Sequence, residues 1–328
     1  MRRTLGLLLF LILLTYLPVR AQIQPQPRKE KILKHEIRLV VENDVFVSLI
    51  RDRYYSSGIF GAYRYQLDSS KYGNKLLNVI RTYELRQRMY TSMFVEDTDL
   101  ADIDRPYAGT LSGSVRQEWY FKKPQYLSVN LELGWMGPGS LTGDIHEIWH
   151  SWFGLPEPRG WFTQLEDAPI ANLFVDHALS LVSSKDQELN GEIILKSSLA
   201  AGTIYNYVQE SVIFRFGKIL NVNRTSHFGN TLGGIRTQYK SEIAVEAYVF
   251  YAPGVRYTFY DGTLQGGLIN TGPSIFTKEP RRWLAHQSFG LMLRYGTFDF
   301  NYLVYVNSRE TDGVGKHSYG AIELRQRF

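Results

Sequence analysis

Residues 127–135 read Leu-Ser-Val-Asn-Leu-Glu-Leu-Gly-Trp, and this alternation decides the fold. In an extended chain successive side chains point to opposite sides, so the apolar residues of this stretch share one face. Ser128, Asn130 and Glu132 share the other face. The same two-residue period recurs at residues 243–249 and 298–306. A chain in which this period dominates is predicted to be all-β.

The alternation fits two architectures, a soluble sandwich with its apolar faces inward and a membrane barrel with its apolar face outward. The runs extend over about 10–13 residues, whereas globular strands centre on about 5–6 and a tilted membrane strand needs about 9–11. The chain also ends in a strand-like run that stops at Phe328. Aromatic residues, which membrane interfaces favour, stand at the run ends: Tyr63, Tyr65, Trp119, Tyr120, Trp135 and Tyr251. We therefore predict a transmembrane antiparallel up-and-down β-barrel, closed so that every backbone group is paired.

About twelve strands are expected, an even number as in bacterial single-chain barrels. Their predicted positions are near residues 35–43, 57–67, 80–90, 107–120, 125–137, 170–182, 189–202, 208–219, 241–261, 285–295, 297–308 and 317–328. The longest connection, at residues 138–169, follows the fifth strand and contains a predicted short helix at 144–153. A loop of about 30 residues in a compact domain is usually functional.

The first 21 residues have the features of a secretion signal. Two arginines precede an apolar run from Leu5 to Leu17, which is shorter than the roughly 20 residues of a membrane-spanning helix. We expect residues 1–21 to be a signal peptide, residues 22–34 a flexible leader, and residues 35–328 a single barrel domain.

The charge and cysteine content exclude several classes of function. Removing the signal peptide takes away three arginines and lowers the formal net charge from +5 to +2, so the charge gives no argument for nucleic-acid binding. Because the chain has no Cys, disulfides, thiol nucleophiles and Cys-ligated zinc are excluded.

Polar clusters lie at one end of several predicted strands. In an up-and-down barrel the connections after the first, third and fifth strands emerge at the same rim. This places Asn43, Asp44, Ser56, the loop 104–109 and His150 together at one mouth of the barrel. Polar groups that are distant in sequence and converge at one rim are what a site requires. With a periplasmic N-terminus, this mouth is expected to face outside.

Four motifs resemble those of a known family. They are Glu42-Asn43-Asp44, then Asp52-Arg53-Tyr54-Tyr55-Ser56-Ser57-Gly58, then Asp104-Arg105-Pro106-Tyr107-Ala108-Gly109, and then Gly137-Pro138 followed by His150 and Gly154. In this order and spacing the chain resembles the lipid A 3′-O-deacylases, the LpxR-like family of outer-membrane barrels. The resemblance implies a twelve-stranded barrel in the bacterial outer membrane. It also implies a calcium-dependent hydrolase that removes the 3′-linked acyloxyacyl chain of lipid A, the anchor of lipopolysaccharide, in the outer leaflet. We expect the protein to act as a monomer.

The resemblance assigns roles to five residues. His150 matches the general base of the family, and Asn43 with Asp44 matches its active-site pair. Ser56 stands where the family has a small hydroxyl residue, and Glu157 is matched to an active-site acid. Two departures point to altered lipid recognition. His146 replaces the usual Gln, and the family's basic pair has no counterpart in residues 90–104, which are acidic.

The chemistry of these residue types is coherent without the family. A neutral imidazole at His150 can accept a proton from water during ester hydrolysis. Calcium prefers oxygen ligands, which Asp44 and Asn43 provide, and it can stabilise the oxyanion. Ser56 can be the nucleophile or a positioning group, and we favour attack by water. With lipid A as the substrate that the resemblance implies, Arg53 and Arg105 are the predicted substrate-binding residues, since guanidinium groups pair well with phosphates.

Structural roles stay open for the same residues. Asn43 and Asp44 can simply form a turn, residues 56–58 can form another, and Arg105 can pair with Asp104 to stabilise the rim. Residues 146–150 match the zinc-peptidase pattern H-E-x-x-H, although no third ligand follows at a suitable spacing. Two further functions fit a barrel with these residues, namely a phospholipase that uses Ser56 and His150, and a porin-like barrel without catalytic activity.

Overall fold

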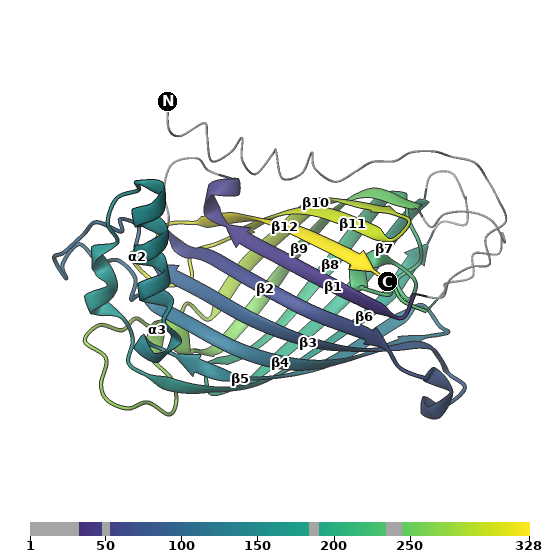
Figure 1. Cartoon of the computed structure of the whole chain (residues 1–328), viewed down its shortest axis with the longest axis horizontal. Helices are drawn as coiled ribbons and strands as arrows, with labels where there is room; N and C mark the ends of the chain where they lie inside the picture. Colours follow the sequence, from purple (N-terminus) through teal and green to yellow (C-terminus); the bar gives the residue numbers. More distant parts are fainter. Residues whose placement is uncertain (1–32, 48–52, 184–189, 234–244) are drawn as a thin grey trace.

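The computed structural model describes residues 33–47, 53–183, 190–233 and 245–328, and in it twelve strands form one closed antiparallel barrel (Figure 1). The predicted signal peptide and nearly all of the predicted leader lie outside the described residues. The strands are β1 His35–Asn43, β2 Tyr54–Gln66, β3 Leu76–Thr91, β4 Ala108–Phe121, β5 Gln125–Met136, β6 Ala168–Ser183, β7 Asn190–Gly202, β8 Tyr205–Lys218, β9 Val245–Asp261, β10 Trp283–Tyr295, β11 Phe298–Asn307 and β12 His317–Arg327. Each strand pairs with its neighbours in sequence, and β1 closes the ring by pairing with β12. The predicted up-and-down barrel is confirmed.

The alternation along each strand separates the lumen from the outer face. In β5 the polar Ser128, Asn130 and Glu132 are buried, whereas Leu131 and Leu133 are exposed. Leu131 pairs with Val115 of β4, which is also exposed, so apolar side chains are neighbours across the outer wall. Polar residues inside and apolar residues outside are the arrangement of a membrane barrel and the reverse of a soluble sandwich. The soluble sandwich is excluded.

The start of β2 differs from the prediction. The strand begins at Tyr54, before the expected residue 57, so Ser56 and Ser57 belong to a strand and do not form the turn considered above. The pairing with β3 passes from Tyr55 to Ser57 and skips Ser56, which is therefore a β-bulge. Bulges bend a strand and redirect a side chain, and they are frequent next to active sites.

Long connections gather at one end of the barrel, which we call the helix rim (left in Figure 1). It carries η1 Asp44–Phe46, η3 Pro138–Ser140, α2 Thr142–Phe153, η4 Arg159–Thr163 and α3 Gly262–Gln265. The predicted helix after the fifth strand is α2, which begins at Thr142 and not at residue 144. The described part of the chain contains no helix that is long and apolar enough to span a membrane.

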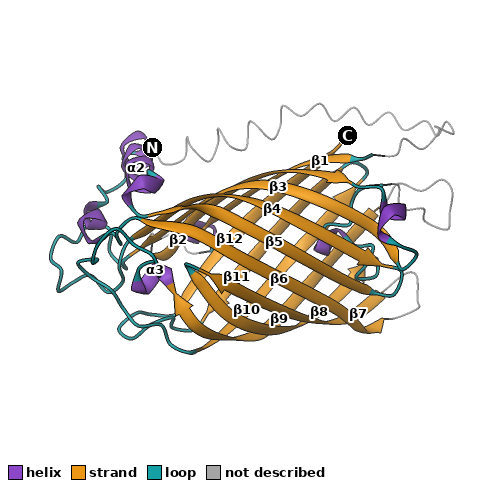
Figure 2. Cartoon of the chain, turned by 90° about the horizontal axis from the view of Figure 1, so that it is seen from below, coloured by secondary structure: helices purple, strands orange, loops and turns teal. Residues whose placement is uncertain are grey.

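The opposite end is closed by residues 219–233, which we call the plug. Figure 2 shows short helical turns gathered at both ends of the barrel, with strands between them. Within the plug Val222, Phe228 and Leu232 are buried, and they belong to one apolar cluster with lumen residues of β3 and β9. Tyr120, predicted to lie at the membrane interface, instead points into the lumen and donates to the carbonyl of Phe228 at 2.7 Å.

Charged side chains of the lumen hold the plug by its backbone. Arg64 donates to the carbonyl of Gly229 at 2.7 Å and pairs with Glu118 at 3.0 Å and with Glu36. Arg325 donates to the carbonyl of Ser226 at 2.7 Å, and the carboxylate of Glu246 accepts from the backbone N–H of Ser226 at 2.7 Å. The plug therefore satisfies its own backbone groups and the buried charges of the wall together.

Candidate active site

The predicted convergence of the polar clusters is confirmed at the level of the rim. The connections after β1, β3 and β5 all emerge at the helix rim, and they carry the predicted residues Asn43, Asp44, Arg105 and His150 (Figure 1). Ser56 lies at the same end, close to the start of β2. These side chains differ in their hydrogen-bond partners and in how deeply they are buried.

The end of β1 forms a capped turn. The side chain of Asn43 accepts the backbone N–H of Val45 at 2.8 Å and so caps η1, as expected if this residue has a structural role. Asp44 is almost fully buried, and its Oδ2 accepts the backbone N–H of Arg53 at 2.7 Å. The Asp44 carboxylate thus links the end of β1 to the chain that enters β2.

Tyr54 ties three connections of the helix rim together. Its backbone has a φ of 58°, which is rare for an aromatic residue and indicates local strain. Its buried hydroxyl donates to Asp104 at 2.8 Å and accepts the backbone N–H of Gly315 at 2.7 Å. Ser56, only 1% exposed, follows two residues later in the bulge. The contacts of Tyr54 therefore hold the backbone at the start of β2, two residues before Ser56.

Arg105 is a buried clamp between loops of the helix rim. Its guanidinium pairs with Glu310 at 2.5 Å, donates to the Thr263 hydroxyl at 2.9 Å and lies 4.6 Å above the ring of Tyr90. Burial alone would lower the pKa of Arg105, but the carboxylates of Glu310 and Asp261 outweigh it and hold the pKa above its ordinary value. This placement supports the structural role considered from the sequence, in which Arg105 forms an ion pair that stabilises the rim. Its partner is Glu310 and not Asp104. Its role in binding substrate stays a prediction.

The helix α2 presents two histidines to the protein. Its first residue, Thr142, lies so close to β4 that a Cβ on Gly109 would be 2.4 Å from the Thr142 Cβ. His146 and His150 are one turn apart on the same buried face, and their Nε2 atoms are 2.8 Å apart. Trp161, which sequence reasoning did not single out, donates its indole N–H to Nδ1 of His146 at 3.1 Å.

These hydrogen bonds determine where the protons of the neutral imidazoles lie. The indole of Trp161 can only donate, so Nδ1 of His146 accepts and its Nε2 carries the hydrogen. That hydrogen points to Nε2 of His150, and Nδ1 of His150 then donates to the carbonyl of Pro156. The lone pair of His150 that would accept a proton from water is therefore bonded to His146 until the two rings separate.

The arrangement does not resemble a zinc-peptidase site. Glu147, the acid of the H-E-x-x-H pattern, is exposed and lies on a different face of α2 from the two histidines. Across the described ranges, no group of three or more His, Cys, Asp and Glu side chains is arranged to hold a metal ion. The pair His146 and His150 is thus explained better by mutual hydrogen bonding than by zinc.

Glu157 lies after the helix, on the surface. Its side chain is 70% exposed and pairs with Arg159 at 3.0 Å. The connection is anchored nearby, because the backbone N–H of Arg159 donates to the carbonyl of Val95 at 2.7 Å. The structure therefore places Glu157 on the same connection as His150 but in solvent, and its assignment as an active-site acid stays a prediction.

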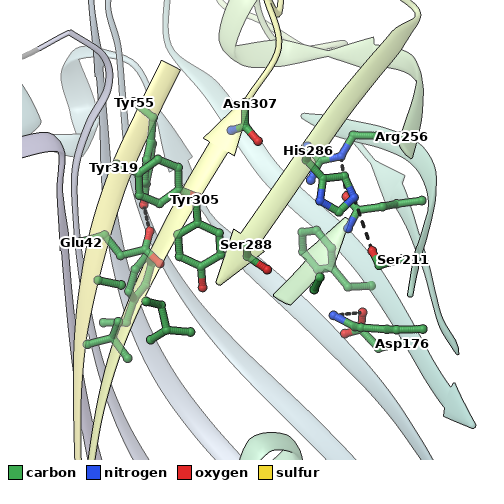
Figure 3. A pocket seen from close by; sticks show the side chains of 18 of the residues that line it. Glu42, Tyr55, Asp176, Ser211, Arg256, His286, Ser288, Tyr305, Asn307 and Tyr319 are labelled. Carbon is green, nitrogen blue, oxygen red and sulfur yellow. Dashed lines mark hydrogen bonds and ion pairs between the residues drawn. The ribbon is translucent and has the colours of Figure 1, made fainter. Parts of the chain in front are cut away.

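The lumen holds a separate cavity of about 590 Å³ (Figure 3). The residues that line it include Glu42, which accepts the Tyr55 hydroxyl at 2.5 Å, and His286, whose Nε2 is 3.4 Å from the Ser211 hydroxyl. Asn43, Asp44, Ser56 and His150 are not among the described residues that line this cavity. The predicted site residues therefore do not belong to the lining of this cavity.

The chain matches a family model and several solved structures. The family model described as Outer membrane protein LpxR matches residues 7–328. The structure titled LpxR from Salmonella typhimurium superposes with a TM-score of 0.72 at 15% identity and covers 89% of this chain and 100% of that one. The β-domain of the Bordetella autotransporter BrkA gives a TM-score of 0.49 at 9% identity, over 91% of this chain and 100% of that one. A search of curated proteins finds no match. On the family match, which spans nearly the whole sequence, the chain belongs to the family of the outer membrane protein LpxR.

Proposed function

We propose that this protein is an outer-membrane lipid A 3′-O-deacylase, which hydrolyses the ester of the 3′-linked acyloxyacyl chain in the outer leaflet. The observation that carries the proposal is His150, a buried imidazole with a defined tautomer on α2, at the rim that also holds Asp44 and Ser56. Membership of the LpxR family supports lipid A as the substrate. The helix rim would face outside, where the outer leaflet lies.

His150 would act as the general base for water. Its Nδ1–H donates to the carbonyl of Pro156, which orients the ring and supports the positive charge that develops when Nε2 takes a proton. His146 must first release Nε2 of His150, so binding of the ester would exchange one hydrogen bond for another. We propose that Ser56 positions the reacting groups and that water is the nucleophile.

Asp44 and Asn43 are the proposed calcium ligands. Both offer the hard oxygen atoms that calcium prefers, and they are adjacent at the end of β1. Each of these side chains also accepts one backbone N–H, but an amide oxygen has two lone pairs and a carboxylate offers about four acceptor sites. Their donor chemistry therefore fits the ion. When bound, calcium would polarise the ester carbonyl and stabilise the oxyanion.

The plug argues against a porin-like function. A porin needs an open aqueous channel, whereas residues 219–233 fill one end of this lumen with buried apolar and hydrogen-bonded groups. A phospholipase that uses Ser56 and His150 would employ the same rim, so the two hydrolases differ in substrate and not in architecture. Assaying phospholipid and lipid A vesicles side by side with the purified protein separates them.

The proposal is tested by mass spectrometry of lipid A from cells with and without the protein. Loss of the mass of the 3′-acyloxyacyl group is expected only in cells that make the protein, and unchanged lipid A would contradict the proposal. The calcium assignment is tested on the purified protein. EDTA should stop deacylation and added calcium should restore it, whereas full activity in EDTA would exclude a role for the metal.

A further inference from the structure

The helix α2 carries three distinct faces. Successive residues of an α-helix are about 100° apart around its axis. The buried residues Thr142, His146 and His150 then share one arc that faces the protein. A second arc is polar and exposed, and it contains Asp144, Glu147 and Ser151.

The third arc, which we call the apolar face, is the unusual one. It consists of Ile145, Ile148, Trp149 and Trp152, whose exposed fractions are 44%, 50%, 53% and 77%. The ring of Phe153 packs at 4.5 Å on that of Trp149 and extends this face at the last turn of the helix. Exposed apolar patches of this kind in a folded protein indicate a partner.

The apolar face lies next to the outer wall of the barrel. Leu111 of β4 pairs with Trp135 of β5, and both side chains are exposed at the helix-rim end of the wall. The connection to α2 lies against Trp135, because a Cβ on Gly139 would be 2.6 Å from Nε1 of Trp135. Leu141, which precedes the helix, is also exposed. The polar group described at this junction is the Asp167 carboxylate, which accepts the Trp135 indole N–H at 2.9 Å and the Gly139 backbone N–H at 2.8 Å. The apolar wall and the apolar face therefore adjoin at the same side of the rim.

The direction of α2 matches a position in the membrane interface. The helix axis crosses the end of the barrel, transverse to its long axis (Figure 1). Since the barrel axis lies along the membrane normal, α2 lies close to the membrane plane. An amphipathic helix in this position buries its apolar side about 5–10 Å below the headgroup boundary and keeps its charged side in water.

We propose that α2 is an interfacial membrane helix whose apolar face contacts the lipid acyl chains next to the barrel. The adjoining apolar wall argues for lipid as the occupant, and the exposed polar arc with Asp144 and Glu147 would face the water above it. The two histidines lie on the buried arc of the same helix and face the protein, not the lipid. The proposal depends on residence in the membrane and not on any particular hydrolysis.

The chain has no Cys, so single cysteines can carry a spin label at chosen positions. We would label Ile148→Cys and Trp152→Cys on the apolar face, with Glu147→Cys and Ser151→Cys as matched controls on the polar arc of the same helix. The full-length protein is reconstituted in phosphatidylcholine vesicles. The accessibility of each label is then measured twice, once to oxygen, which is enriched in the bilayer, and once to a water-soluble nickel chelate.

The ratio of oxygen to nickel accessibility should be severalfold higher at the two apolar positions than at the two controls. Equal ratios at all four positions would overturn the proposal. So would dipolar broadening at Trp152→Cys, because it would show that a second copy of the chain and not lipid covers this face. Neither measurement uses deacylation, so a protein without activity on lipid A can still confirm or contradict the lipid contact.

Discussion

The two ends of the barrel differ in how their charged side chains and their connections are held. At the plugged end, buried Arg64 pairs with two carboxylates and a backbone carbonyl, and the plug covers them. At the helix rim, Arg159 and Glu157 pair in solvent, and Tyr54 adopts a strained backbone to hold three connections together. The difference indicates that the plugged end provides stability whereas the helix rim keeps reactive groups in place.

The largest expected effect is a loss of activity caused by a substitution at the helix rim. His150→Ala should lower deacylation by about 10²–10⁴-fold, because a positioned general base contributes roughly that factor. The barrel should remain folded, as judged by its heat-dependent migration on gels. His177→Ala, at an exposed position of β6, is the matched control and should keep full activity. Retained activity of His150→Ala would remove this residue from the mechanism.

The next prediction compares the contribution of one charged pair at each end to the free energy of unfolding. Arg64→Ala leaves the buried carboxylate of Glu118 without this cation and leaves Glu36 with Arg327, at 3.6 Å, so it should lower the free energy of unfolding by about 3–5 kcal/mol. Arg159→Ala removes an exposed pair and should change it by about 0–1 kcal/mol. Urea unfolding in lipid vesicles measures both. Similar losses for the two variants would refute the proposed division between the ends.

A smaller effect tests whether Arg105 is a structural clamp. Arg105→Lys keeps the charge but loses the fork that reaches Glu310 and Thr263, so stability should fall by about 1.5–3 kcal/mol. The relative rates on lipid A with and without its phosphates should stay as in the parent protein. A changed phosphate preference at unchanged stability would instead support the predicted contact with substrate.

The smallest effect is a pH dependence of the plugged end. Burial, with Arg215 and Lys196 nearby, holds the pKa of His227 well below its ordinary value. The unfolded chain therefore binds a proton below about pH 6.5 that the folded chain does not, and stability falls as the pH drops through this range. His227→Phe should reduce that slope in urea unfolding at pH 5 to 8. An identical slope in both proteins would contradict this assignment.

The sequence was sufficient for the barrel because alternation reports directly which side chains face lipid, as in residues 127–135. Strand parity placed Asp44, Ser56 and His150 at one rim, because in an up-and-down barrel the connections after odd-numbered strands emerge at the same end. The plug was not predicted, since its Asn, Thr and Ser residues resemble those of an external loop. The bond from Trp161 to His146 was also missed, because it depends on how a loop folds back on α2; an aromatic residue within a long functional connection was the available signal.

The pairing of β1 with β12 has a consequence for assembly. The residues that close the ring, such as Glu36 and Arg327, are almost a full chain length apart. Until β12 pairs with β1 and β11, the edges of these two strands have unpaired backbone groups that the hydrocarbon of a bilayer cannot accommodate. Insertion into the membrane must therefore be coupled to closure, and a chain cut short before β12 should accumulate as an unfolded precursor that carrier proteins hold or proteases degrade.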